Sequence, residues 1–177
     1  MNILKPLQIP HEENTKGFDA LAFSAVFKTQ LSTMYCALTH LSKNLAILGS
    51  LASFPSLRLA FDESLEDTHK QLKRIDEIAK FFIVDDYENH SLGVEAIVQE
   101  TYVAISKTPA NSFQRDMSLI FYAHIIKHVE VGAYRTLRIA AAKLGYNQAK
   151  TLLTENMDEA KDNDKLFLLI SKHHLDN

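Results

Sequence analysis

Apolar residues recur every three or four positions along most of the chain, which is the spacing of one face of an α-helix. The first series runs from Phe23 through Leu38 to Leu48, with polar residues between its members. It is predicted to end near Ser53, because Pro55 disfavours helical geometry in the residue before it. This part of the chain is therefore predicted to form one long helix.

Four more helices are predicted by the same spacing. A second long helix covers about 56–79, and a short helix covers about 94–105. The third long helix covers about 112–144 and is closed by Gly145, since glycine readily adopts the left-handed conformation that ends helices. The last long helix covers about 147–171.

The sequence as a whole is typical of an all-α protein, because no stretch alternates apolar and polar residues as a half-buried strand does. Four long helices with short connections predict an antiparallel four-helix bundle with one additional short helix. We predict an extended arm at 1–17, the bundle at 18–172 and a frayed tail at 173–177.

The third long helix has more apolar residues than one packing face can use. They lie on several sides of it: Leu119, Ile120, Phe121, Ile125, Ile126, Val129 and Val131. Either the short helix or a second subunit is expected to cover the surplus face. A homodimer through apolar helix faces is our prediction, with the short helix as the cover if the protein is a monomer.

Composition narrows the class of protein. The 177 residues carry a formal charge of −3, and the Lys and Arg residues are scattered, so we expect no nucleic-acid partner. A single cysteine, Cys36, excludes an internal disulfide and fits a reducing compartment. The longest weakly polar run is too short to cross a bilayer. We therefore expect a cytoplasmic protein without a membrane partner.

The stretch HIIKHVEVGAY, residues 124–134, carries the most suggestive polar residues. His124 and His128 stand four apart and could chelate one metal ion, although partly exposed or interface histidines have the same spacing. Glu66 and His69 have the Glu-x-x-His spacing of di-metal bundles, which also arises by chance on solvated helix faces. These residues fit either a metal site or an ordinary packed helix.

Three longer stretches together resemble a known family. They are MYCALTHLSKNL, SLRLAFDESLEDTHKQLKRIDEI and KHVEVGAYRTLRIAAAKLGYNQAKTLLTENMDEAKDNDKL. They are similar to the YciF-type ferritin-like proteins of bacteria, a stress-associated family. The resemblance covers roughly Gln30 to Ile170. It implies a ferritin-like bundle that holds metal between its helices.

The resemblance is selective at the expected ligands. Acids match the family's pattern at Glu66, Asp67, Glu95, Glu100, Glu130, Glu159 and Asp164. Three further positions, on three different helices, have acids in the family but Leu38, Lys127 and Ala160 here. Leucine and alanine donate nothing to a metal. A lysine about 4 Å from a divalent ion would repel it by ~8 kcal/mol at an effective dielectric constant of about 20.

We therefore expect a degenerate di-metal site with no metal or other cofactor, and a non-catalytic role in stress or in protein interaction is favoured over an enzyme. The alternative is an iron or manganese protein with oxygen or peroxide chemistry. Its ligands would be Glu66, His69, Glu130, Glu159 and Asp164. In the favoured case the Lys127 ammonium takes the place of the metal and pairs with Glu130, Asp164 or both.

Overall fold

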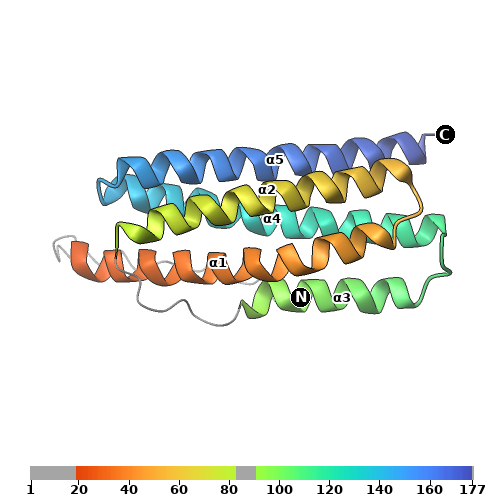
Figure 1. The fold of residues 1–177 in the computed structure, drawn as a ribbon, viewed down its shortest axis with the longest axis horizontal. Coiled ribbons are helices and arrows are strands. Elements are labelled where there is room, and N and C mark those ends of the chain that lie inside the picture. Colours follow the sequence, from red (N-terminus) through yellow and green to blue (C-terminus); the bar gives the residue numbers. More distant parts are fainter. Residues whose placement is uncertain (1–18, 83–90, 177) are drawn as a thin grey trace, which may run out of the picture.

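The computed structural model describes residues 19–82 and 91–176, which form five helices and contain no strand. The helices are α1 (Ala20–Ser50), α2 (Pro55–Lys80), α3 (Leu92–Ser106), α4 (Phe113–Lys143) and α5 (Asn147–Leu175) (Figure 1). The predicted ferritin-like four-helix bundle with one additional short helix is confirmed. The predicted arm at 1–17 lies outside the described residues.

The four long helices lie side by side, and each runs antiparallel to its two neighbours (Figure 1). α1 packs on α2 and α4, while α5 packs on α2 and α4. The diagonal pair α2 and α4 run parallel, which requires the chain to return along the bundle between them. α3 lies on that return path. A single long crossover of this kind is the connectivity of ferritin-like bundles.

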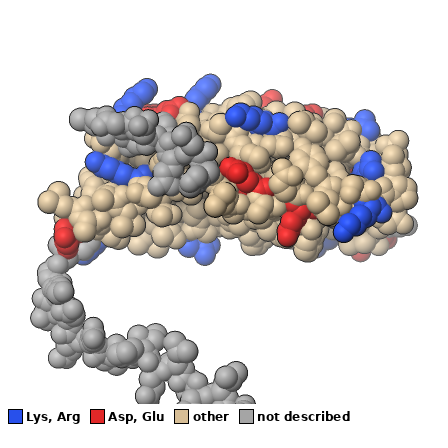
Figure 2. Space-filling view, turned by 90° about the horizontal axis from the view of Figure 1, so that it is seen from below, with Lys and Arg blue, Asp and Glu red and all other residues tan. Residues whose placement is uncertain are grey.

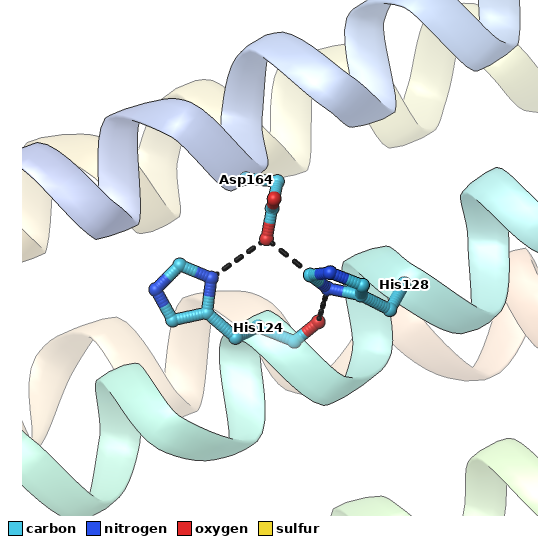
Figure 3. Close-up of side chains that lie close together, drawn as sticks. All are labelled: His124, His128 and Asp164. Carbon is cyan, nitrogen blue, oxygen red and sulfur yellow. Dashed lines mark hydrogen bonds and ion pairs between the residues drawn. The ribbon is translucent and has the colours of Figure 1, made fainter.

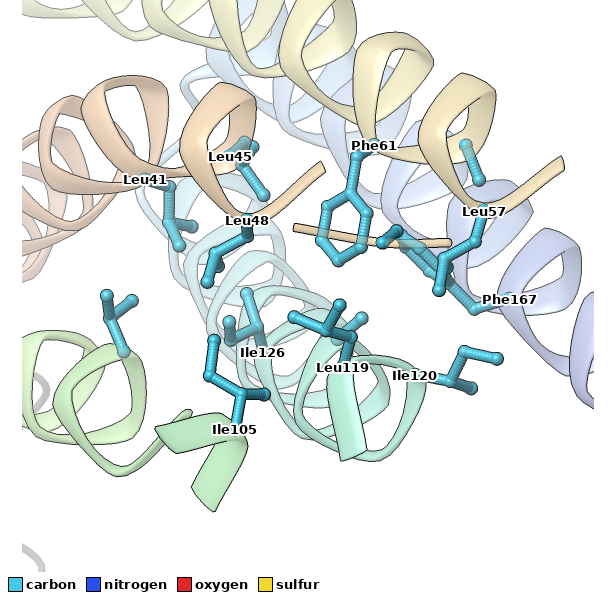
Figure 4. Packing of buried hydrophobic residues seen from close by; sticks show 14 of the residues in the cluster. Leu41, Leu45, Leu48, Leu57, Phe61, Ile105, Leu119, Ile120, Ile126 and Phe167 are labelled. Carbon is cyan, nitrogen blue, oxygen red and sulfur yellow. The ribbon is translucent and has the colours of Figure 1, made fainter. Parts of the chain in front are cut away.

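The surplus apolar face of α4 is covered in part by α3. Val98 and Ile105 of α3 are buried against Leu119 and Ile126 of α4 in one apolar cluster with α1 (Figure 4). α3 has 15 residues and α4 has 31, so the short helix covers only one half of the α1–α4 face. The expectation that the short helix lies over this face is confirmed for that half.

Most helix ends are explained by residues close to them in the sequence. One helix start is instead held by a residue that lies far away in the sequence. Gly145, with φ of 78°, follows α4 and allows the tight turn into α5. α2 begins at Pro55, and the two residues before it are held by the buried Asp116 of α4. The Asp116 carboxylate accepts hydrogen bonds from the backbone N–H groups of Ser53 and Phe54 at 2.8 and 2.9 Å.

The end of α5 differs from the prediction. The frayed tail expected at 173–177 is wrong for its first residues, because α5 continues to Leu175. His174 stacks on Phe54 with ring centroids 3.6 Å apart, and this contact holds the last turn against the start of α2. A short run of polar residues at a chain end gave no sign of that packing.

The interior consists of two apolar clusters separated by a polar layer. One cluster contains Leu41, Leu45, Phe61 and Phe167, and the other contains Leu31, Leu38, Ile75, Leu153 and Ala160. Along α2, α4 and α5, the positions between the clusters hold buried polar side chains: Ser64, Thr68, Gln71, Lys127, Glu130, Asn156 and Asn163. This polar layer is where the sequence placed a degenerate metal centre.

Candidate functional site

A buried ion pair lies at the centre of the polar layer. Lys127 and Glu130 are each only 1% exposed, and the Lys127 Nζ lies 3.0 Å from both carboxylate oxygens of Glu130. They are three residues apart on the side of α4 that faces the interior, so the helix itself holds them together. The predicted pairing of Lys127 with Glu130 is confirmed.

Glu130 is buried away from bulk solvent. Burial raises the pKa of Glu130 above its ordinary value, and the negative charge of Asp67 adds to that rise. The Lys127 charge and its hydrogen bonds act in the opposite direction and lower the pKa, but they do not outweigh burial. The ammonium therefore supplies the positive charge that a buried carboxylate needs.

In the neighbouring part of the polar layer, neutral side chains join the helices by hydrogen bonds. The hydroxyl of the buried Tyr134 donates to Gln71 Oε1 at 3.0 Å. Burial raises the pKa of Tyr134 well above its ordinary value, which keeps the hydroxyl protonated. Gln71 also donates to the backbone carbonyl of Asn156 at 3.4 Å, which joins α2 to α5.

The other side of the layer leaves two polar atoms without partners among the described residues. Asn163 donates to Asp67 Oδ2 at 2.8 Å and to its own helix, but its Oδ1 accepts no hydrogen bond there. The buried Ser64 Oγ is likewise unsatisfied. Buried polar atoms of this kind are costly and are commonly served by a water molecule.

These residues do not fit a di-metal centre. Such a centre needs several inward carboxylates and imidazoles around two ions. Here the buried set of the layer has one carboxylate, Glu130, already bound by a lysine, together with hydroxyls and amides. Leu38 and Ala160, at two of the family's acid positions, are fully buried in the apolar cluster beside the layer.

The residues of the alternative metal set do not come together at one site. Glu66 and His69 are exposed on α2. Glu159 is bound by Arg74, whose guanidinium lies 2.8 Å away, and so closes a surface bridge between α2 and α5. Glu130 is the one buried member. Asp164, which we also expected as a partner of Lys127, instead lies beside two histidines.

His124, His128 and Asp164 form the one group of metal-binding side chains found in the described residues (Figure 3). The His124 Nδ1 lies 2.6 Å from Asp164 Oδ1, and the His128 Nδ1 lies 3.3 Å from the same oxygen. The sequence singled out the two histidines but assigned Asp164 to the core. Only the register of α5 against α4 brings the acid to them.

Comparison with known proteins gives the chain its family. Residues 22–175 match a family described as a domain of unknown function, DUF892. The chain is also 34% identical over 145 residues to protein YciF of Escherichia coli strain K12, which covers 78% of this chain and 84% of that protein. The chain belongs to this family. Its resemblance to YciF-type proteins, noted from the motifs above, is thereby confirmed.

Solved structures agree with that assignment. The crystal structure of the E. coli stress protein YciF matches with a TM-score of 0.82 and 31% identity, over 88% of this chain and 98% of that chain. YcfI of Rhodopseudomonas palustris matches with a TM-score of 0.78 over 84% of this chain and 94% of that chain. At 21% identity, the second match supports the fold alone.

Proposed function

We propose that this YciF-like bundle is a non-catalytic protein in which the Lys127–Glu130 ion pair stands in place of a di-metal centre. The observation that carries this proposal is the position of the Lys127 ammonium, which is buried and 3.0 Å from both oxygens of Glu130. A fixed positive charge there competes directly with a cation for the one buried carboxylate of the layer.

The role that remains for such a bundle is structural or interactive. The E. coli relative is called a stress protein, and we propose a stress-associated role in the cytoplasm for this chain as well. No helix in the described ranges combines the length and the apolar character that a bilayer crossing requires. A folded helical scaffold with no metal chemistry would act through the surfaces that it presents.

Metal loading tests the proposal. The protein is incubated without oxygen with Fe²⁺ or Mn²⁺, desalted and analysed for metal, in a His128→Ala background so that the surface histidine cluster contributes nothing. We expect far less than one ion per chain. The matched variant Leu38→Glu/Lys127→Glu/Ala160→Glu returns the family's acids and is the positive control. Two retained ions per chain without these changes would overturn the proposal.

A second copy of the chain is our proposed partner. Beyond the half of the α1–α4 face covered by α3, an apolar hollow of about 190 Å³ is lined by residues of both helices. Val26 and Ile139 at this hollow are 55% and 60% exposed. The underside of the bundle, seen in Figure 2, has wide stretches without charged side chains. Exposed apolar surface of this kind favours association.

Light scattering with matched variants tests this homodimer. Wild-type protein is expected at twice the monomer mass at tens of micromolar, and Ile139→Glu is expected at the monomer mass. Leu59→Glu, which changes a well exposed leucine on α2, is the control and should remain dimeric. A wild-type protein that stays monomeric would contradict the proposal, and so would an Ile139→Glu variant that still dimerises.

A further inference from the structure

His124, His128 and Asp164 form a cluster on the more exposed side of α4 and α5, beside the polar layer rather than inside it, and the family match gives the three residues no joint role. Two successive turns of α4 supply the histidines, and α5 supplies the carboxylate (Figure 3). One donor atom from each of the three lies within 4.8 Å of the others. We propose that these residues bind a single divalent transition-metal ion, with Zn²⁺ as the probe, and that the ion fastens α4 to α5.

The donor set selects the class of ion. Two imidazoles and one carboxylate suit Zn²⁺, Co²⁺, Ni²⁺ or Cu²⁺, whereas Ca²⁺ and Mg²⁺ prefer oxygen ligands alone. Ligand atoms around tetrahedral Zn²⁺ lie roughly 3.3 Å apart, given bond lengths of about 2.0–2.2 Å. The His128 Nδ1 is 3.3 Å from Asp164 Oδ1, and it also donates to the backbone carbonyl of His124 at 2.9 Å, a hydrogen bond that it must release to bind the ion. The His124 Nδ1, at 2.6 Å from the same carboxylate oxygen, must move slightly apart from it.

An ion can reach the cluster without opening the bundle. The His128 side chain is 71% exposed, while those of His124 and Asp164 are partly buried. Three protein ligands leave coordination positions for water on the solvent side. The cluster is therefore an open, surface-facing site rather than a closed structural cage.

Local charges favour a cation there. The two lysines of α5 nearest in sequence are each paired with another acid, Lys161 with Asp158 at 2.9 Å and Lys165 with Asp162 at 2.8 Å. Lys127 lies on the side of α4 that faces the interior, and Glu130 neutralises its positive charge. Among the described residues, the recorded partners of Asp164 are the two histidines, so its negative charge faces the ion.

The same geometry also describes a His124–Asp164 hydrogen bond and a His128–Asp164 ion pair that join the helices without any metal, and the test separates the two cases. Protein without an affinity tag is titrated with ZnCl₂ by calorimetry. We expect one Zn²⁺ per chain and at least a tenfold weaker affinity in each of His128→Ala, His124→Gln and Asp164→Asn, since even the loss of an outer-shell partner costs about that much.

Two controls keep the result specific. His69→Ala removes an exposed histidine of α2, and His173→Ala/His174→Ala removes the pair at the end of α5. Both are expected to bind Zn²⁺ as the wild type does. The proposal is overturned by an absence of binding, by binding that survives His128→Ala, or by binding that is lost in the tail variant.

Two further readouts report on the coordination and on the clamp. Co²⁺ bound at the site should give visible absorption bands that disappear in Asp164→Asn. Zn²⁺ at about a hundredfold excess over its Kd should raise the Tm by roughly 5 °C or more, because it binds only the folded chain. Binding without a rise in Tm would show that the ion does not fasten α4 to α5. The proposal stands apart from the proposed function, since the loading test above is made without His128.

Discussion

Lys127 and His128 are neighbours in sequence on α4, and they meet opposite environments. Lys127 points into the bundle, is 1% exposed and depends on Glu130 for charge balance. His128 points outward, is 71% exposed and shares Asp164 of α5 with His124. The inner pair has a large energetic weight because water cannot replace a lost partner there. The outer cluster has little weight in the free protein but remains accessible to a ligand.

Substitution in the apolar cluster beside the polar layer should cause the largest loss of stability. Leu38→Glu removes a fully buried leucine and places an unpartnered carboxyl among apolar side chains. We expect a loss of about 5 kcal/mol, the lost burial and the buried polar group together. Urea denaturation followed by circular dichroism measures it. An unchanged melting temperature combined with iron uptake would instead mean that Leu38 lines a working metal site.

The ion pair itself comes next. Lys127→Met leaves Glu130 buried without its counter-charge, and we expect a loss of about 4 kcal/mol near neutral pH. The double variant Lys127→Met/Glu130→Leu removes both charges and should recover most of that stability. Equal instability of the single and double variants would show that packing, and not charge, explains the loss.

The loss in Lys127→Met should depend on pH in a defined direction. Burial already raises the pKa of Glu130 above 4.5, and removal of the lysine removes the two influences that lower it. The folded chain then holds this proton more tightly than the unfolded chain does, so stability falls as pH rises above 4.5. The deficit relative to wild type should therefore shrink as the pH is lowered from neutral toward 4.5. A deficit that grows in acid would contradict this assignment.

A neutral partner in the layer should matter less. Tyr134→Phe removes the hydroxyl that donates to Gln71 and leaves that buried oxygen without it. We expect a loss of about 1–2 kcal/mol, which is the usual cost of stranding one buried hydrogen-bonding group. Thermal unfolding at neutral pH measures it. A loss as large as that of Lys127→Met would mean that the hydrogen bond to Gln71 contributes as much to stability as the ion pair does.

The outer cluster should show the smallest effect. His128→Ala in metal-free protein is expected to change the unfolding free energy by less than about 1 kcal/mol, because exposed ion pairs contribute little. Denaturation in the presence of a chelator measures this. A loss comparable to that of Lys127→Met would show that the two faces of α4 do not differ in the way described.

Most of the fold could be predicted from the sequence, because it rests on local patterns. The 3.6-residue spacing gave all five helices, and Gly145 gave the turn before α5. The Lys127–Glu130 pair was also predictable, since a spacing of three residues on one helix fixes the geometry. Contacts between helices were harder. The hydrogen bonds from Ser53 and Phe54 to Asp116 join residues more than sixty positions apart, and no local pattern indicates them.

The candidate sites show the same division. Leu38 and Ala160 could be placed in the core because each lies on an apolar stripe. Asp164 was expected near Lys127 and instead lies beside His124, because a small rotation of α5 decides which side of α4 its acids meet. Glu159 likewise found Arg74 of α2, a partner that spacing along α5 does not reveal.

The placement of Lys127 and Glu130 on one helix has a consequence for the order of folding events. The pair can form as soon as this turn of α4 is helical, before α4 has docked on any other helix. When docking then removes water from the layer, the carboxylate enters the interior with its counter-ion already attached. A pair divided between two helices would have to find its register while both charges were losing their hydration. Because acid and base stand one turn apart on α4 in this chain, no docking step has to bring the two charges together.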